Sequence, residues 1–467
     1  MNKVFGTFSK LVTKYFPNIG SFMLTFRDYK NQLENLLDGM FLAVQKIRWH
    51  KLGSRMKFKF YTREPKSNRW KVPYFVAKAN AFVSCGEGYE TARSCIIDAQ
   101  LSFQKLFEEN TGEEYRKANY TFLDPGWVTN IGHMAMLSIF PKLELLNLAP
   151  KKTKILFYVS AANPSLLELY QRFYKIIKIN PKSLAKDLIV NRDILQPMGA
   201  YDTFDGVKDE YEAHNYAERA YRDKFALTPF LSPNEVDKEF VLNSLNLKNR
   251  SKLLSPFVIL HVRNSPALRT RSANNADIST YIPAIKFLLS NGITVVRMGN
   301  PAMPNLKELE ESNTNFVDYA HSQYRSPSLD LYLWSHAKFS ICTSSGPAWI
   351  PNEFGIPSLL TNAPHLSMIY GISGFFIPHK YFDIKSNLQL NYETVVRSGF
   401  GSSWSETGKG MRRERNTEHE ILRATKDMFE KYILLNPLNS YPQLSFIKHD
   451  MEISPSFYEN NLDLLRN

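Results

Sequence analysis

The feature that most constrains the fold is a regular alternation of short apolar runs with helical patterns in the second half of the chain. Residues 257–263 form a continuous apolar run that ends in polar groups, and a helical pattern then begins at Asp277 and closes at Asn291-Gly292. Further apolar runs lie at 293–296, 339–342 and 358–360, and helices are expected at 329–337 and from Pro347. Strands that alternate with helices at this spacing predict a parallel sheet covered by helices.

A second unit of the same kind is expected nearer the N-terminus. An apolar run at 154–159 precedes a helix start at Asn163-Pro164-Ser165. Residues 190–250 are polar and contain Pro229 and Pro233, which indicates a connection between two lobes. The chain is therefore expected to have four parts, with the bounds 1–117, 118–240, 241–385 and 386–467.

The net charge of +13 is concentrated at the N-terminus. Residues 1–64 hold 12 Lys and Arg against 4 Asp and Glu, so this segment carries +8 of the total. Such an excess indicates a polyanionic partner, and a basic segment that also contains aromatic residues can lie on an anionic membrane surface. The alternative is an ordinary solvated helix with one apolar face. The overall content of 43% hydrophobic and 22% charged residues excludes a disordered or collagen-like chain.

Nothing in the sequence indicates export or a membrane span. The longest stretch without Asp, Glu, Lys or Arg is 354–379, but it contains Pro357, Pro364, Gly371 and Gly374, which favour core strands and loops over a helix. Three cysteines are too few for a disulfide framework. We therefore expect a cytoplasmic protein that is soluble or peripheral at the inner face of the membrane.

Polar residues gather where the predicted strands end. His261 and Arg263 end one strand, Arg297 ends the next, and Thr343, Ser344, Ser345 and Gly346 follow a third. Ligands of parallel sheets bind at the carboxyl ends of the strands, where backbone N–H groups and an arginine fork suit a diphosphate. The alternative is an ordinary strand-to-helix turn, and His261 would then be a core histidine.

Several residues are candidates for acid–base chemistry. Asp318 and His321 lie close together after a predicted strand, and His133 follows Asn130-Ile131-Gly132 in a loop-to-helix turn. Asp277 is either part of the site or a helix cap. The chain has no Asp-x-Asp pair, so no metal site is expected.

Motifs spread over residues 120–430 resemble those of a known family. In chain order they are Ile131-Gly132-His133, Ala162-Asn163-Pro164, His261-Val262-Arg263, Asn275–Ile278 with Thr280-Tyr281, Arg297-Met298-Gly299, Asp318-Tyr319-Ala320, Ser344-Ser345-Gly346, Gly355-Ile356-Pro357 and Asn416-Thr417. With these motifs the chain resembles glycosyltransferases encoded with bacterial surface-polysaccharide genes. That family is built on the GT-B plan, an α/β fold of two facing Rossmann-like lobes with parallel sheets. The His-x-Arg strand end is also similar to that of fucosyltransferases, in which such an arginine contacts the donor diphosphate.

The resemblance implies a metal-independent glycosyltransferase that moves a sugar from a nucleotide-sugar donor to a glycan or lipid-linked glycan. The first lobe would hold the acceptor, and the second would hold the donor. A basic, mainly helical N-terminal segment would precede the two lobes, and a C-terminal helical extension would follow them. Arg263, Arg297, His261 and the turn Thr343–Gly346 would bind the donor, while His133, Asp318 and Asp277 would serve catalysis. No cofactor or nucleic acid is expected.

One position departs from the family pattern. Asn264 stands where an Asp is expected after His-Val-Arg, so a carboxylate supplied by that position would be missing here. Two other functions stay open: a nucleotide-sugar epimerase with the same two lobes, and a non-enzymatic basic protein that binds membranes or nucleic acid through residues 1–64.

Overall fold

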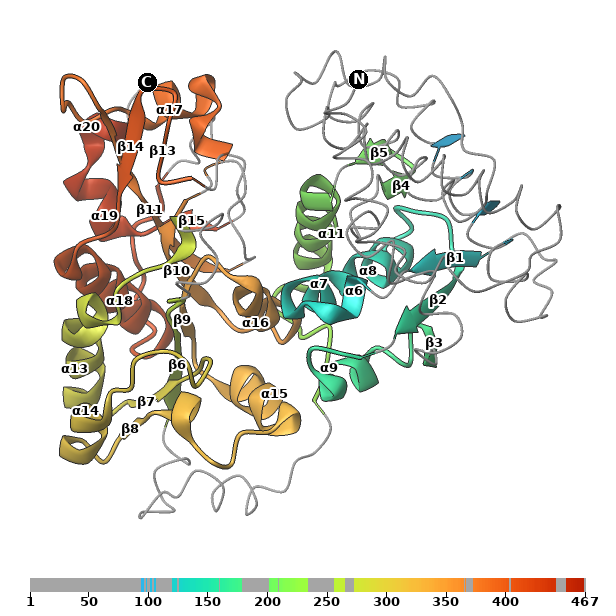
Figure 1. The fold of residues 1–467 in the computed structure, drawn as a ribbon, viewed down its shortest axis with the longest axis horizontal. Coiled ribbons are helices and arrows are strands. Elements are labelled where there is room, and N and C mark those ends of the chain that lie inside the picture. The colour runs from blue at the N-terminus through green and yellow to red at the C-terminus, as the bar shows by residue number, and fades with distance from the viewer. Residues whose placement is uncertain are drawn as a thin grey trace, which may run out of the picture. The chain divides into compact units, whose positions relative to one another are not determined.

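The structure is a computed structural model of the 467-residue chain. It describes residues 120–123, 126–158, 160–178, 201–208, 210–233, 256–264, 273–364, 366, 373–402, 405–441 and 451–465, together with 94, 95, 98, 101, 102 and 105. The chain divides into two compact units, 1–115 and 116–467, and both predicted lobes belong to the second (Figure 1). The predicted membrane-binding segment, residues 1–64, and most of the predicted helical N-terminal part lie outside the described residues.

The first lobe contains a small parallel sheet. Its strands are β1 (Tyr120–Leu123), β2 (Thr153–Tyr158) and β3 (Lys175–Lys178), hydrogen-bonded in that order. The helices α6 (Gly126–Thr129), α7 (Ile131–Ala135), η2 (Met136–Ser138) and α8 (Ile139–Leu145) connect the first two strands, and α9 (Pro164–Leu169) connects the next two. Asn163 begins α9 because its side chain accepts a hydrogen bond from Leu166 N at 2.9 Å. The predicted strand and helix start are both confirmed.

The second lobe is built on a seven-stranded parallel sheet with the order β15-β11-β10-β9-β6-β7-β8 among the described residues. The strands are β6 (Phe257–His261), β7 (Thr294–Arg297), β8 (Phe316–Val317), β9 (Ser340–Thr343), β10 (Ser358–Ala363), β11 (Gly374–Pro378) and β15 (Glu452–Ile453). Counted along the chain from β6, the first six strands follow the Rossmann order 3-2-1-4-5-6. The predicted α/β class with parallel sheets is confirmed, and the direction of winding reverses between β6 and β9.

Helices cover both faces of this sheet. Figure 1 shows α13 (Ile282–Ser290) and α18 (Glu418–Tyr432) on one side and α15 (Pro327–His336) and α16 (Ile350–Glu353) on the other. The strands from β6 to β11 are buried almost throughout, as the apolar runs predict. The uncharged stretch 354–379 contains β10 and β11. No helix in the described part of the chain is long and apolar enough to cross a membrane.

One long helix is not expected from the sequence. The polar region 190–250 reads as a connection, but it contains α11 (Glu210–Phe225), which packs against α8. The buried positions of α11 are Ala213, His214, Ala217, Glu218 and Tyr221. This face has helical spacing but contains a histidine and a glutamate, so an apolar-periodicity argument does not detect it.

The region after β11 contains strands as well as the predicted helices. β12 (Lys380–Asp383), β14 (Met411–Glu414) and β13 (Thr407–Gly408) form an antiparallel sheet in that order. The helices α17 (Tyr392–Ser398), α18 and α19 (Pro455–Asn460) surround it in the chain, and β15 returns to the edge of the main sheet. The C-terminal region therefore completes the second lobe.

The start of α18 offers a test of local stability. Thr417 accepts a hydrogen bond from Glu420 N, and the Glu420 carboxylate accepts one from Thr417 N at 2.8 Å, which makes a reciprocal capping box. Replacing Thr417 with Ala is expected to lower the free energy of unfolding by about 1 kcal/mol in urea titrations. Thr417→Ser keeps the hydroxyl and serves as the matched control, and an equal loss in both variants would contradict the capping role.

Candidate active site

The carboxyl ends of β6 and β9 bring the two predicted halves of the donor site together. His261 ends β6, and its Nδ1 lies 3.3 Å from Ser345 Oγ in the turn after β9. The backbone N–H of Arg263 donates to Thr343 Oγ1 at 2.8 Å. These two contacts join the predicted His-Val-Arg and Thr-Ser-Ser-Gly elements at the point where the winding of the sheet reverses, which is where open α/β sheets bind ligands.

The surroundings of His261 favour its neutral form. Burial lowers the pKa of its imidazole to about 4, and the positive charges of Arg263 and Arg297 act in the same direction. A neutral imidazole beside Ser345 can orient a hydroxyl or donate one hydrogen bond, but it does not supply a positive charge at pH 7. Arg263 and Asn264 are half-buried and follow the strand. Arg263 is therefore the strand-end residue whose charge can face a ligand here.

The turn after β9 leads directly into a helix. Ser345 precedes η7 (Gly346–Trp349), and Pro347 occupies its first turn. Because proline has no N–H, this helix start offers fewer backbone donors to an anion than the sequence pattern indicates. Thr343 and Ser344 are fully buried, whereas Gly346 is half-buried. The part of the turn that remains accessible is therefore the glycine backbone.

The first lobe meets this turn at a close contact between two glycines. Asn130 begins α7 and accepts a hydrogen bond from Gly132 N at 2.8 Å. A Cβ atom on Gly132 would lie 2.8 Å from Gly346 Cα, and one on Gly346 would lie 3.0 Å from Gly132 N. Only glycines allow the two backbones to approach this closely. The half-buried His133 follows Gly132, so this contact brings the predicted Ile-Gly-His and Ser-Ser-Gly elements together.

Arg297 and Asp318 form a buried ion pair beside this site. Asp318 Oδ2 accepts hydrogen bonds at 3.0 Å from Arg297 Nη1, from Leu306 N and from His321 Nδ1. Arg297 and Asp318 have side chains only 2% and 1% exposed. The predicted proximity of Asp318 and His321 is confirmed. These contacts favour a structural role, and the assignments of Asp318 as a base and of Arg297 as a donor contact stay predictions.

Asp277 caps a helix. Its exposed side chain accepts a hydrogen bond from Ser279 N at 2.9 Å at the start of η5 (Ile278–Tyr281). The capping interpretation is confirmed, and a catalytic role for Asp277 stays a prediction.

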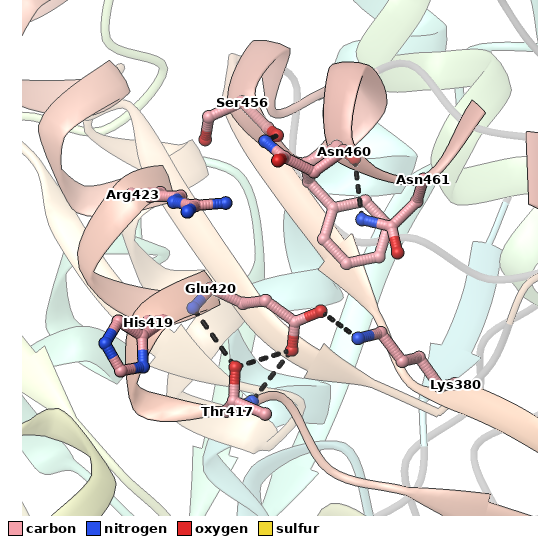
Figure 2. A pocket seen from close by; sticks show the side chains of 9 residues that line it. Lys380, Thr417, His419, Glu420, Arg423, Ser456, Asn460 and Asn461 are labelled. Carbon is pink, nitrogen blue, oxygen red and sulfur yellow. Dashed lines mark hydrogen bonds and ion pairs between the residues drawn. The ribbon is translucent and has the colours of Figure 1, made fainter.

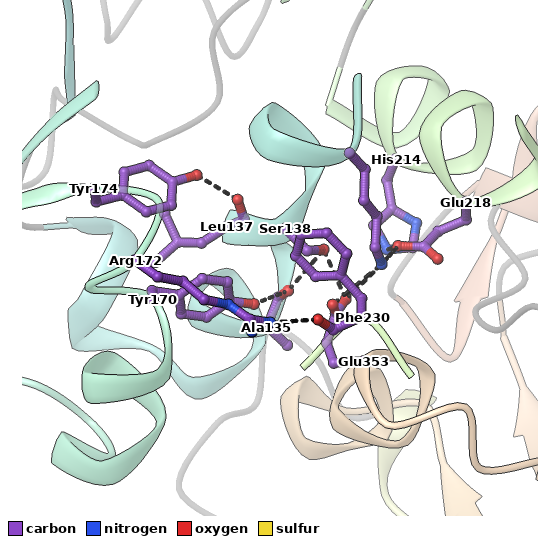
Figure 3. A network of polar contacts seen from close by, with 11 residues as sticks. Ala135, Leu137, Ser138, Tyr170, Arg172, Tyr174, His214, Glu218, Phe230 and Glu353 are labelled. Atoms are coloured by element: carbon purple, nitrogen blue, oxygen red, sulfur yellow. Dashed lines mark hydrogen bonds and ion pairs between the residues drawn. The ribbon is translucent and has the colours of Figure 1, made fainter. Parts of the chain in front are cut away.

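Sequence reasoning misses a cluster of buried charged residues (Figure 3). Lys142 of α8 contacts Glu218 of α11, and its Nζ lies 3.1 Å from Glu353 Oε2 of α16. Glu353 Oε1 also accepts a hydrogen bond from Ser138 Oγ at 2.7 Å, and His214 Nε2 lies 3.6 Å from Glu218 Oε1. The members come from three distant segments without a motif, so no sequence signal could have found them.

This cluster also contains the described residues that come nearest to a metal-ligand set. Ligand atoms of His214, Glu218 and Glu353 lie within 4.8 Å of one another. However, the Lys142 ammonium contacts both carboxylates and already supplies the positive charge between them. The lysine ammonium therefore lies where a metal cation would have to bind both carboxylates.

A polar pocket of about 260 Å³ lies at the start of α18 and includes the capping-box residues Thr417 and Glu420 (Figure 2). Figure 2 shows the Glu420 carboxylate between Thr417 and Lys380, and the Lys380–Glu420 ion pair is 2.5 Å long. Its remaining lining residues are His419, Arg423, Ser456, Phe457, Asn460 and Asn461. None of the predicted catalytic or donor-binding residues lines this pocket, although Thr417 of the Asn416-Thr417 motif does.

The chain matches no protein-family model and no curated protein. Among solved structures it is similar to a glycosyltransferase family 9 protein from Veillonella parvula, with a TM-score of 0.35 and 10% identity over 67% of this chain and 96% of that one. It is also similar to E. coli ADP-heptose LPS heptosyltransferase II, with a TM-score of 0.39 and 13% identity over 67% and 99% of the chains. The iron-containing dodecameric glycosyltransferase TibC from enterotoxigenic E. coli gives a TM-score of 0.32 and 15% identity over 68% and 75%. At these values, the fold assignment rests on the strand order of the second lobe.

Proposed function

We propose that this protein is a glycosyltransferase that moves a sugar from a nucleotide-sugar donor to a glycan acceptor in the synthesis of a bacterial surface polysaccharide. The observation that carries the proposal is the meeting of the His261–Arg263 strand end with the Thr343–Gly346 turn where the Rossmann winding reverses. A Rossmann order alone does not define a reaction, so the proposal depends on the residues at this point. The motif resemblance over residues 120–430 supplies the reaction class.

The leaving diphosphate gains negative charge in the transition state, so the site needs positive charge and hydrogen-bond donors. We assign this role to the Arg263 guanidinium and the Gly346 backbone, with His261 holding Ser345 in place. No metal is invoked, because an arginine fork binds phosphate oxygens directly. His133 is the candidate base for the acceptor hydroxyl, since it follows the glycine that contacts Gly346.

Replacing Arg263 with Ala tests the donor assignment. We expect donor turnover to fall by about 100-fold or more, because a charge-assisted contact to the leaving group is lost. Arg397→Ala is the matched control, since Arg397 has a side chain 78% exposed and pairs with Glu393 within α17. The measurement is release of nucleotide from sugar donors with and without glycan acceptors. Equal turnover in both variants would refute the assignment.

Sugar conversion and binding measurements separate the two other functions from a transferase. Conversion of the donor sugar without any acceptor would identify an epimerase instead of a transferase. Binding of vesicles or nucleic acid that disappears when residues 1–64 are deleted, with no donor turnover at all, would favour a non-enzymatic binding protein. The transferase proposal predicts that donor binding survives this deletion.

A further inference from the structure

The helix that follows the Ser344–Gly346 turn is held along one face by the first lobe. η7 and α16 form a continuous helical segment from Gly346 to Glu353. Its positions 346, 349 and 353 are three and seven residues apart, which places them on the same side of the helix. Gly346 abuts Gly132 of α7, and the ring of Trp349 meets that of His214 edge-on with the centroids 4.2 Å apart.

Glu353 makes the strongest contacts on this face. Its carboxylate accepts a hydrogen bond from Ser138 Oγ at 2.7 Å and pairs with the Lys142 ammonium at 3.1 Å, and both partners belong to the first lobe. Its backbone oxygen accepts hydrogen bonds from Phe230 N and Leu231 N at 3.0 and 2.9 Å. Glu353 therefore anchors the end of the helix both to the first lobe and to the chain that leads from it into the second lobe.

All the ionic members of this anchor are buried. Lys142, Glu218 and Glu353 are at most 1% exposed, and Glu218 Oε2 has no hydrogen-bond partner. Two carboxylates share a single ammonium, so the cluster would carry a net negative charge away from the stabilising effect of bulk solvent. The natural relief is protonation of one carboxyl group. Burial raises the pKa of Glu353 to about 7, and the negative charge of Glu218 acts in the same direction.

We propose that Glu353 is a positioning residue: through Lys142 and Ser138 it fixes the helix that begins at Gly346, and with it the Ser344–Gly346 turn, against α7 of the first lobe. The ligand that this turn would hold rests on the proposed function, but the contacts themselves do not. The clasp formed by Ser138, Lys142, Glu218 and Glu353 then sets the separation between the Gly346 backbone and His133. Protonation of Glu353 makes this separation depend on pH.

The histidine, the lysine and the tyrosines that face Glu353 do not change charge near neutral pH. Burial holds the pKa of His214 at about 4, so that it is neutral, and it raises the tyrosine pKa values above 10. The carboxylates of Glu218 and Glu353 raise the pKa of Lys142, which therefore stays charged. The titratable and charged groups around Glu353 are Lys142 of α8, His214, Glu218 and Tyr221 of α11, and Tyr170 and Tyr174 after α9.

Amide hydrogen exchange of the full chain tests the positioning role without any ligand. We expect Glu353→Ala to accelerate exchange across residues 344–354 by about tenfold or more, because buried partners lose their hydrogen bonds. Exchange in α13, on the other face of the same sheet, should stay unchanged. The control is Glu311→Gln, since the Glu311 side chain is 66% exposed. Equal acceleration in both segments would reduce Glu353 to a general stabilising residue and overturn the proposal.

A second variant keeps the test decisive if Glu353→Ala does not fold. Glu353→Gln imitates the protonated carboxyl group, so it should retain the slow exchange of residues 344–354 at every pH. In the wild type, amide exchange in residues 344–354 should accelerate as the pH rises through about 7, because Glu353 then loses its proton. The rates are compared after correction for the intrinsic pH dependence of amide exchange. Identical pH profiles in both proteins would contradict the role of the proton.

Nucleotide affinity gives the readout that links the clasp to the site. We expect Glu353→Ala to weaken the binding of a nucleoside diphosphate by about tenfold, whereas Glu353→Gln should bind it as the wild type does at pH 6. If the wild type binds no nucleotide, the proposed function is wrong, but the exchange results still test the positioning role of Glu353. If the wild type binds and Glu353→Ala binds equally well, the positioning role fails alone.

Discussion

Replacing Gly132 with Ala is expected to separate the two helix starts at the candidate site and to abolish nucleotide binding. The added Cβ would lie 2.8 Å from Gly346 Cα, which is a backbone atom and cannot rotate away. Alanine favours a helix over glycine by up to about 1 kcal/mol, but overpacking a close contact costs about 1–3 kcal/mol. We therefore expect a lower free energy of unfolding in urea together with the loss of binding by calorimetry.

Gly401→Ala is the matched control for this prediction. A Cβ at Gly401 would have its nearest neighbours at 3.5 Å, which is ordinary contact. The variant should unfold and bind as the wild type does. If Gly132→Ala bound nucleotide with unchanged affinity, the contact between α7 and η7 would not be part of the site.

Replacing Arg297 with Met is expected to cause the largest loss of stability, about 3–5 kcal/mol. The substitution leaves the Asp318 carboxylate, 1% exposed, without the guanidinium that neutralises it. The double variant Arg297→Met with Asp318→Asn removes both charges and should recover much of the loss. Urea unfolding of the single and double variants, followed as a double-mutant cycle, measures this coupling.

An exposed ion pair provides the comparison. Lys307 and Glu311 are 72% and 66% exposed, so Lys307→Met should change the free energy of unfolding by less than about 0.5 kcal/mol. If Arg297→Met were equally harmless, the ion pair would not be structural, and its contacts would no longer argue against Asp318 as the catalytic base.

The sequence predicts the second lobe well because its signals are local. Apolar runs such as 257–261 and 340–343 are strands buried on both faces, and Asp277 and Asn163 are helix caps whose side chains act within three residues. The carboxyl ends of parallel strands lie at the same edge of a sheet. The sequence pattern alone therefore places His261 and Ser345 near each other, at the edge where ligands bind.

The features that the sequence does not predict depend on contacts between distant segments. Lys142 and Glu353 are separated by more than two hundred residues, and each looks like a solvated surface charge when considered alone. The contact between Gly132 and Gly346 joins two glycines whose separate motifs each indicate a ligand-facing turn. α11 escapes prediction because its buried face includes His214 and Glu218, which pair with each other and also contact Trp349 and Lys142 of other helices.

The most direct measurement for the central claim is calorimetric binding of ADP, GDP, UDP and CMP to the wild type and to Arg263→Ala. We predict that at least one nucleotide binds the wild type and that Arg263→Ala weakens this binding by about 100-fold, while Arg397→Ala leaves it unchanged. Binding that is equal in the wild type and Arg263→Ala, or no binding of any nucleotide, would contradict the assignment of a nucleotide-sugar site to the carboxyl ends of β6 and β9.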